Sequence, residues 1–249
     1  MGIGFVDLHC HLLPGVDDGP ETLDQSVAYA RAAAAAGTST IVATSHVELL
    51  DVRELPDRVQ EVRDALEAEG IELRILVGGE LKPQSIGDLD EDELEIIAHG
   101  PPGARWLLYE VPFEGVASDF LAGAQELRER GYGLLLAHPE RSRDILDGGL
   151  ELLEPELLAG AVVAANVGPI TGRESVARHT AAVEILRRGI VGVLATDAHP
   201  PTRPYTLAEG RAAVAELTGD ADLARRLTGL TAAALLEFGI PVGTGSPAR

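Results

Sequence analysis

The chain has 249 residues, of which 45% are hydrophobic, so it can bury the core of one large domain or of two small ones. Its formal net charge is −20, which argues against nucleic acids and anionic membranes as partners, because both attract basic surfaces. The single cysteine, the absence of an apolar run near the roughly 20 residues of a membrane span, and the lack of a signal-peptide pattern lead us to expect a cytoplasmic protein without membrane insertion.

Short apolar runs alternate along the chain with longer runs of helix-forming residues. The apolar runs predict seven strands, at 3–8, 39–44, 72–79, 106–111, 134–137, 161–167 and 191–196. The runs between them predict helices at 21–36, 55–69, 118–130 and 174–188, each followed by a glycine. Three more helices are predicted after the last strand, at 207–217, 222–226 and 231–238. This alternation predicts a parallel sheet covered by helices.

The number of strand–helix units favours one fold over another. Seven units favour a closed or nearly closed α/β barrel, and an open doubly wound sheet is the alternative. No linker rich in Pro, Gly or Ser divides the chain, so we expect a single domain over residues 1–249. No glycine-rich phosphate loop of either common spacing occurs.

Histidines and carboxylates stand at the C-terminal ends of the predicted strands. They are His9, His11, His46, Glu80, Glu110, His138, Asp197 and His199. The loops at that end of an α/β barrel build its active site, so residues far apart in sequence would converge there. His9 and His11 are two residues apart, which directs both rings to one side of a strand. Imidazoles and carboxylates that face one pocket are natural metal ligands.

Four residues near these motifs have roles that the spacing leaves less certain. Asp17 and Asp18 precede the first predicted helix, and either could be a ligand, although acidic residues also stabilise a helix N-terminus. Asp7 is expected to orient a ligating imidazole rather than to bind metal itself. Cys10 is expected to be a buried, inert thiol that points away from the histidines.

Two arginines follow the later motifs in loops. Arg141 and Arg203 would present two planar donors to a phosphate, the group that arginine recognises best. The alternative for Arg141 is a structural ion pair with Glu140 or Asp144. The remaining histidines, His99 and His179, belong to no motif and are expected to be solvated.

These motifs resemble those of the PHP (polymerase and histidinol phosphatase) superfamily. The resemblance covers residues 7–19 (DLHCHLLPGVDDG), 41–46 (IVATSH), 78–80 (GGE), 107–113 (LLYEVPF), 137–141 (AHPER) and 196–199 (TDAH), and continues to Arg203-Pro204. More narrowly, the chain resembles the bacterial tyrosine-protein phosphatases encoded with capsule and exopolysaccharide operons. It departs from that pattern at Val47, where a histidine or arginine is usual, and in the acidic loop 48–54, which could contact the substrate.

The resemblance implies a distorted (β/α)7 barrel that holds three divalent metal ions, often manganese, with iron or zinc also found. It implies one metal held by His9, His11, Glu80 and Asp197, a second by His46, His138 and the shared Glu80, and a third by Asp18, Glu110 and His199. It therefore favours Asp18 over Asp17 as the ligand. It also implies that Arg141 and Arg203 contact phosphate.

The activity that the resemblance implies is phosphomonoester hydrolysis, in which a metal-activated hydroxide attacks phosphorus. The expected substrate is a phosphotyrosine protein, in particular a cognate bacterial tyrosine kinase of capsule or exopolysaccharide synthesis. The alternatives are a PHP phosphatase of a small metabolite such as histidinol phosphate, a phosphodiesterase, and a metal-binding regulatory domain without turnover. No nucleic-acid partner is expected, and the oligomeric state is left open, a homo-oligomer included.

Overall fold

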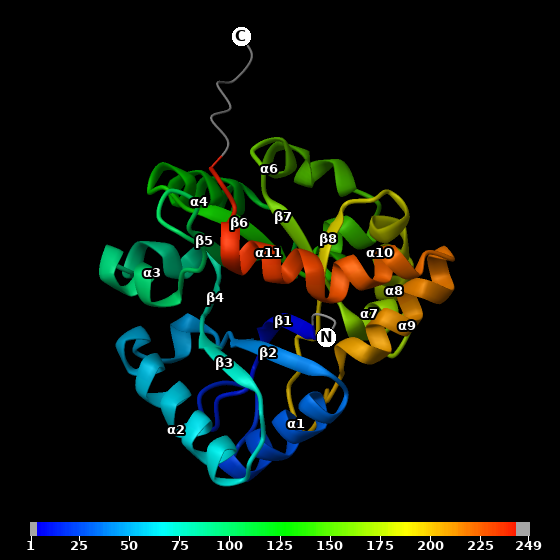
Figure 1. Ribbon diagram of the computed structural model, residues 1–249. Helices are drawn as coiled ribbons and strands as arrows, with labels where there is room; N and C mark the ends of the chain where they lie inside the picture. Colours follow the sequence, from blue (N-terminus) through cyan, green and yellow to red (C-terminus); the bar gives the residue numbers. More distant parts are fainter. Residues whose placement is uncertain (1–3, 243–249) are drawn as a thin grey trace.

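The structure is a computed structural model that describes residues 4–242 (Figure 1). The strands are β1 (Phe5–Cys10), β2 (Thr38–Ala43), β3 (Arg74–Val77), β4 (Glu80–Leu81), β5 (Trp106–Glu110), β6 (Gly133–Ala137), β7 (Val162–Asn166) and β8 (Val191–Ala195). They form two parallel sheets, with the orders β1-β2-β3 and β4-β5-β6-β7-β8. The first predicted strand begins at Ile3, which lies outside the described residues.

The predicted strand at 72–79 is confirmed as β3 alone; Gly78 and Gly79 break the chain, and β4 begins at Glu80, just beyond the predicted range. Side chains from neighbouring segments pack closely against the backbone at this break. A Cβ atom on Gly78 would lie 2.5 Å from Val42, and one on Gly79 would lie 2.6 Å from Val47. β3 pairs with β2 whereas β4, which was not predicted, pairs with β5; each of the other described strands overlaps a predicted one.

Two seams join the sheets into a barrel. At the first seam, the Glu80 amide donates to the Ser45 carbonyl oxygen over 3.0 Å. At the second, the Asp197 amide donates to the His9 carbonyl over 2.8 Å, and the His11 amide donates to the Ala198 carbonyl over 3.0 Å. The predicted distorted (β/α)7 barrel is therefore confirmed, with its distortion concentrated at the break between β3 and β4.

Helices cover the outside of the barrel. The longer ones are α1 (Leu23–Ala35), α2 (Leu55–Ala68), α4 (Ser118–Glu129), α8 (Val176–Arg187), α9 (Leu207–Thr218) and α11 (Thr231–Phe238). The shorter ones are α3 (Glu91–Ile97), α5 (Arg143–Leu146), α6 (Glu154–Leu158), α7 (Val167–Ile170) and α10 (Ala221–Arg225). Short 3-10 segments complete the loops at η1 (Val47–Leu49), η2 (Val52–Glu54), η3 (Pro83–Asp88), η4 (Pro139–Arg141) and η5 (Leu150–Leu153), and η6 (Arg226–Leu230) is π-helical. All seven predicted helices are confirmed, whereas α3, α5, α6 and α7 were not predicted.

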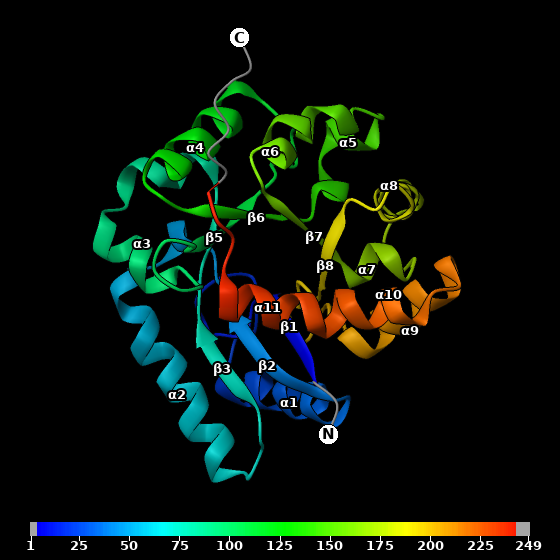
Figure 2. The same cartoon turned by 45° about the horizontal axis from the view of Figure 1, so that its top comes forward.

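The interior of the barrel is apolar, and α11 closes its N-terminal end. Figures 1 and 2 show α11 lying across the barrel, with β1–β3 on one side of it and β5–β8 on the other. Trp106, the first residue of β5, is fully buried, and its indole nitrogen donates to the Leu235 carbonyl over 2.8 Å. The amide of Ile240, beyond α11, donates to the Ala104 carbonyl over 3.0 Å. Polar side chains of the barrel can therefore gather only at the opposite, C-terminal end.

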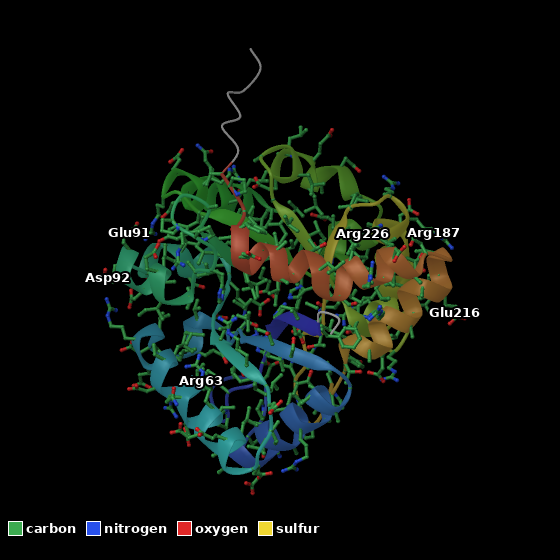
Figure 3. The ribbon with its side chains drawn as sticks, viewed as in Figure 1. Arg63, Glu91, Asp92, Arg187, Glu216 and Arg226 are labelled. Carbon is green, nitrogen blue, oxygen red and sulfur yellow. The ribbon has the colours of Figure 1, made fainter. Side chains whose placement is uncertain are left out.

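Charged side chains cover the outer face of the helices. In Figure 3, Glu91 and Asp92 of α3, Glu216 of α9 and Arg187 of α8 lie at the periphery, and all of them are exposed. Within residues 4–242, no helix combines the length and the apolar character that crossing a membrane requires.

Candidate metal centre

The structure brings all of the predicted ligands together at the C-terminal ends of the strands. An inner cavity of about 80 Å³ is lined by eight of them, namely His11, Asp18, His46, Glu80, Glu110, His138, Asp197 and His199. The ninth, His9, contacts this set through its Nε2 atom, 3.3 Å from Nε2 of His11. Most of these side chains are buried, whereas the Asp18 side chain is 65% exposed and forms part of the rim.

The ligand atoms fall into three clusters in which all atoms lie within 4.8 Å of one another. The clusters are His9 with His11 and Glu80, then Glu80 with Glu110 and His138, and finally His11 with Asp18, His46 and His199. This grouping differs at four residues from the one that the resemblance implies: His46 and Glu110 exchange clusters, His11 belongs to two clusters, and Asp197 belongs to none. His46 lies with Asp18 and His199, and Glu110 lies with Glu80 and His138.

Glu80 lies at the centre of the clusters. Its carboxylate oxygens are 2.9 Å from His138 Nε2 and 3.1 Å from His46 Nδ1. They are also 3.3 Å from His11 Nε2 and 3.4 Å from His9 Nε2. Nδ1 of His46 is buried and makes no hydrogen bond despite this proximity. Several imidazole and carboxylate atoms that converge on one point, one of them without a hydrogen bond, fit a cation between them, because a buried charged group needs a partner.

Two carboxylates of the centre have pKa values that move in opposite directions. Burial alone would raise the pKa of Glu80, but the charge of His9 and hydrogen bonds from the neighbouring imidazoles hold it well below its usual range. Burial, together with the charge of Glu80, raises the pKa of Glu110. Two close carboxylates cannot both ionise cheaply in a buried site. A divalent cation between them would remove this conflict.

Asp17 fixes the orientation of His11. Its Oδ2 atom is 2.8 Å from His11 Nδ1, and its carboxylate also accepts from the backbone amides of Gly19 and His46. Burial lowers the pKa of His11, but hydrogen bonds to Asp17 and Glu80 outweigh it and raise that pKa to about 10. Burial would raise the pKa of Asp17, yet the contacts with His11 lower it to about 2. Such a partner holds a metal-binding imidazole in one tautomer and one orientation.

The predicted role of Asp7 is wrong, because its carboxylate contacts no imidazole ring. It accepts hydrogen bonds from the Thr196 hydroxyl over 2.5 Å, the Thr196 amide over 3.1 Å and the His9 amide over 3.3 Å. Burial raises the pKa of Asp7 to about 6. Asp7 thus ties β1, which carries His9, to the segment after β8, which carries Asp197.

Backbone strain accompanies two of the ligands. His138 and Asp197 have φ values of 38° and 47°, in the left-handed region that residues other than glycine rarely adopt. His138 is the first residue after β6, and Asp197 is the second residue after β8. The carboxylate of Asp197 accepts from the Asn166 side chain over 2.8 Å, so Asn166 at the end of β7 is a positioning residue that sequence reasoning missed. Strain of this kind is characteristic of functional sites.

The two predicted arginines face the inner cavity. Arg141 is buried, and its Nη1 donates to Asp197 Oδ2 over 2.6 Å. Arg203 lies 4.0 Å from the carboxylate oxygens of Asp18 and Asp197. Glu140 and Asp144, the alternative partners of Arg141, accept instead from the backbone amides of Asn166 and Val116. The guanidinium groups are therefore held at the metal centre, where an anion would meet both.

An outer cleft of about 510 Å³ adjoins the inner cavity. It is lined by Asp18, His46, Lys82, Pro83, Gln84, Glu110, Pro112, Phe113 and Glu114. Glu48 pairs with Lys82 over 2.5 Å, so the loop that departs from the family pattern does reach the wall of this cleft. Val47 itself is buried and packs toward Gly79, which explains why it takes no part in the rim.

Three residues outside the centre complete the comparison with the sequence predictions. Cys10 is fully buried in the core between barrel and helices, as predicted, and burial raises the pKa of its thiol. The prediction of solvated rings is wrong for His99 and holds only in part for His179. The His99 ring packs 5.1 Å from that of Trp106, and burial lowers its pKa to about 4. The His179 ring is partly buried, and its Nδ1 is 2.8 Å from the Pro169 carbonyl oxygen.

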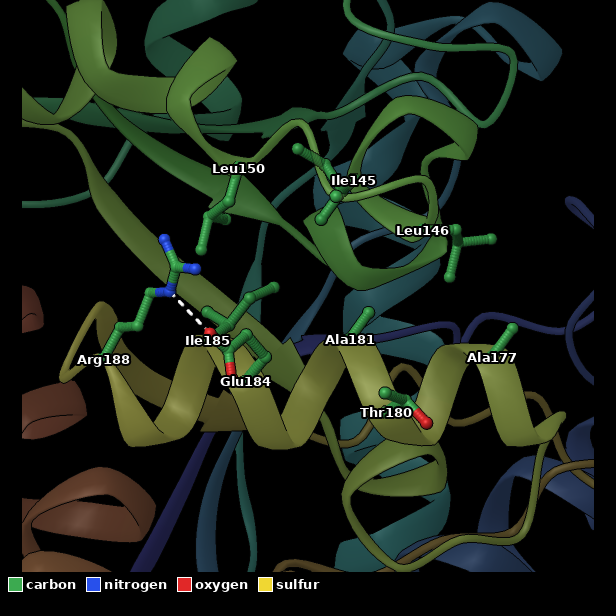
Figure 4. Close-up of a pocket in the computed structure, with 10 residues that line it drawn as sticks. Ile145, Leu146, Leu150, Ala177, Thr180, Ala181, Glu184, Ile185 and Arg188 are labelled. Carbon is green, nitrogen blue, oxygen red and sulfur yellow. Dashed lines mark hydrogen bonds and ion pairs between the residues drawn. The ribbon is translucent and has the colours of Figure 1, made fainter.

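A separate cavity of about 280 Å³ lies between α8 and the segment from Ile145 to Leu150 (Figure 4). Its walls include the apolar side chains of Ile145, Leu150 and Ile185, and the Glu184–Arg188 pair borders it with a contact of 2.7 Å. None of the predicted site residues lines this cavity. It is therefore distinct from the metal centre.

Comparisons with known proteins place the site in a family context. The model of the family described as "Capsular polysaccharide synthesis, CpsB/CapC" matches residues 5–237. The tyrosine-protein phosphatase YwqE of Bacillus subtilis is 29% identical over 199 residues, which are 78% of this chain and 77% of YwqE.

Solved structures show the same relationship. One structure, from a study of YwqE from Bacillus subtilis and CpsB from Streptococcus pneumoniae, described as unique metal-dependent tyrosine phosphatases, aligns with a TM-score of 0.79 and 25% identity. The alignment covers 98% of this chain and 99% of the other. The phosphotriesterase homology protein of Escherichia coli, at 13% identity and a TM-score of 0.53, covers 80% of this chain and 84% of its own and shares the fold.

Proposed function

The chain belongs to the CpsB/CapC family of capsular polysaccharide synthesis, and we propose from this that it is a metal-dependent phosphatase that hydrolyses phosphotyrosine in proteins. One observation carries the proposal. Histidines and carboxylates from the ends of the barrel strands converge on an inner cavity that two guanidinium groups also face. The relatives named as tyrosine phosphatases cover most of the chain, and their activity agrees with this chemistry.

We propose that the three clusters each hold one divalent ion, with manganese as the expected metal. The mixture of imidazole and carboxylate ligands suits Mn²⁺, Fe²⁺ and Zn²⁺ alike. Glu80 would be shared by two of the ions and His11 by two of the clusters. When bound, such ions supply Lewis acidity to phosphoryl oxygens and lower the pKa of water in the site.

The chain's own residues would bind the substrate and hold the centre in place. Arg141 and Arg203 would donate to the phosphoryl oxygens and stabilise the charge that builds on them in the transition state. Asp17 orients His11, and Asn166 orients Asp197, so the ligands need little rearrangement during the reaction. A tyrosyl leaving group has a pKa of about 10, so its departure needs little help from a general acid.

The proposed substrate is phosphotyrosine on a protein, and the proposed partner is a cognate bacterial tyrosine kinase of capsule or exopolysaccharide synthesis. The outer cleft supports a protein substrate, because it opens beside the inner cavity and offers about 510 Å³ for the residue that carries the phosphate. We further propose that residues 1–249 form one phosphatase domain that acts in the cytoplasm. A homo-oligomer fits this proposal as well as a monomer does.

The test is hydrolysis by chelator-treated protein before and after Mn²⁺ is restored. We expect no turnover of a phosphotyrosine peptide without metal, recovery with Mn²⁺, and much weaker turnover of histidinol phosphate. His138→Ala should abolish recovery, because it removes a proposed metal ligand that lies 2.9 Å from the shared ligand Glu80. The matched control, His179→Ala, removes a histidine outside the centre and should recover fully. Faster turnover of histidinol phosphate than of the peptide would refute the proposed substrate class, and metal-independent turnover would refute the mechanism.

A further inference from the structure

We propose that Phe113 is the surface on which the aromatic ring of the substrate stacks, and that it gives this phosphatase a preference for aryl over alkyl phosphates. The inference deepens the proposed function and rests on it. It concerns a residue that binds neither metal nor phosphate and that would select among phosphate esters by the group attached to them.

Phe113 stands out because its ring is exposed beside a polar site. It is 41% exposed, whereas Phe120, seven residues further on in α4, is fully buried in the core. Phe113 lies in the loop that leaves β5, three residues after Glu110. Exposure alone would not single out Phe113, because Phe238 is 65% exposed, so the inference rests on where the Phe113 ring lies.

The position of Phe113 is the second argument. It lines both the inner cavity and the outer cleft, together with Asp18, His46 and Glu110. A phosphate held by Arg141 and Arg203 would fill the inner cavity, so the ester oxygen would point toward the outer cleft. The group bonded to that oxygen must then pass Phe113.

The neighbours of Phe113 hold its ring beside the phosphate position, where a substrate in the outer cleft would contact it. The Cζ atom of Arg141 lies 4.9 Å from the ring centroid, and the His138 ring lies 5.5 Å away at 49°. These two contacts fix the ring beside the phosphate position. Among the described residues that line the outer cleft, Phe113 offers the one benzene ring, while Lys82, Gln84 and Glu114 offer polar groups.

A stacked ring should favour a phenyl group over a methyl group on the same acid. Aromatic pairs gain energy beyond the area that they bury, and the energy depends on the ring geometry. The contact between Arg141 and the Phe113 ring suggests an alternative role, in which Phe113 only holds the guanidinium group in place. The two roles differ in what happens to a phosphonate that lacks a ring, so binding of two phosphonates can separate them.

The experiment measures binding of phenylphosphonate and methylphosphonate to the Mn²⁺-loaded protein by calorimetry. We expect the wild type to prefer phenylphosphonate. In Phe113→Leu, phenylphosphonate should bind about fivefold to tenfold more weakly, with tenfold equal to about 1.4 kcal/mol, while methylphosphonate changes by less than about twofold. Phe113→Trp should keep the preference. Phe238→Leu, the same change on the exposed side of α11, is the matched control and should behave as the wild type.

The outcomes separate this proposal from the proposed function. If Phe113→Leu weakens both phosphonates equally, Phe113 acts through Arg141 and the proposal is overturned. An unchanged preference in that variant overturns it as well. If melting curves show that Phe113→Leu is unfolded, Phe113→Trp decides, and a lost preference in the folded Trp variant overturns the proposal. A wild type that binds neither phosphonate refutes the proposed function itself.

Discussion

The adjacent residues Asp17 and Asp18 should differ in what they contribute to the metal centre, although their side chains are chemically identical. Asp17 accepts from the ring of His11 and from two backbone amides, which makes it the residue that orients a ligand. Asp18 faces His199 at 3.0 Å and His46 at 3.7 Å and belongs to a candidate metal cluster. Replacing each by asparagine removes one negative charge while keeping the side-chain shape.

The expected magnitudes follow from these contacts. Loss of a partner that orients a metal-binding imidazole costs about 10- to 100-fold in metal affinity or activity, or about 1.4 to 2.8 kcal/mol. That range agrees with about 1.5 to 3 kcal/mol for a hydrogen bond to a charged group. Asp17→Asn should therefore bind the same number of Mn²⁺ ions more weakly. Asp18→Asn removes a ligand, and it should bind one ion fewer per chain.

The assay is Mn²⁺ titration by calorimetry, with bound metal counted after gel filtration and turnover of p-nitrophenyl phosphate measured alongside. Asp222→Asn, on the exposed helix α10, is the control and should match the wild type in all three readings. The reverse pattern, in which Asp17→Asn loses an ion and Asp18→Asn only binds more weakly, would refute the assignment of orienting residue and ligand.

Three further predictions concern pH and stability. In the metal-free protein the pKa of His11 is raised to about 10. The protonated ring therefore stabilises the folded state fully below pH about 6.5, and this stabilisation is lost as the pH rises through about 10. Mn²⁺ must displace this proton, so the affinity of the protein for Mn²⁺ should rise between pH about 6.5 and about 10, with release of a proton. Calorimetry measures both, and an affinity that does not change with pH would contradict the prediction. Glu110→Gln should raise the Tm of the metal-free protein at pH 8, because burial raises the pKa of Glu110 and ionisation then favours the unfolded chain; an unchanged Tm would count against this. Trp106→Phe should lower the free energy of unfolding by about 0.5 to 1.5 kcal/mol, because the Leu235 carbonyl loses the indole donor and keeps only the Gly239 amide as its partner. Urea denaturation measures this loss, and a variant as stable as the wild type would show that the bond does not hold α11.

The sequence predicted the barrel because its strands are short apolar runs separated by long helical runs. The same reasoning could not see the break between β3 and β4, since the apolar residues Ile75–Val77 run directly into Gly78 and Gly79 without a charged residue or a proline to mark an end. The break depends on Val42 and Val47, which press on Gly78 and Gly79 from neighbouring segments. The short helices α5, α6 and α7 were also not predicted, because four or five residues carry too little periodicity.

The candidate site could be predicted as a set of residues but not as a network. The ends of parallel strands meet at one rim, so residues such as His9 and His138 were expected together. Which carboxylate faces which imidazole depends on loop conformation and on the seam between β1 and β8. Asp7 is therefore tied to Thr196, and Asp17 holds His11. A role for Phe113 in substrate binding could not be predicted from the sequence, because an aromatic residue after a strand is usually part of the core.

The most direct test of the metal centre is an anomalous difference map from crystals of the Mn²⁺-loaded protein with phosphate. We predict three peaks, one within each cluster, with Glu80 bonded to two of them and the phosphate in contact with Arg141 and Arg203. Fewer peaks in the inner cavity, or Mn²⁺ bound away from Glu80 with the phosphate elsewhere on the protein, would contradict the proposal that these clusters form one phosphatase centre.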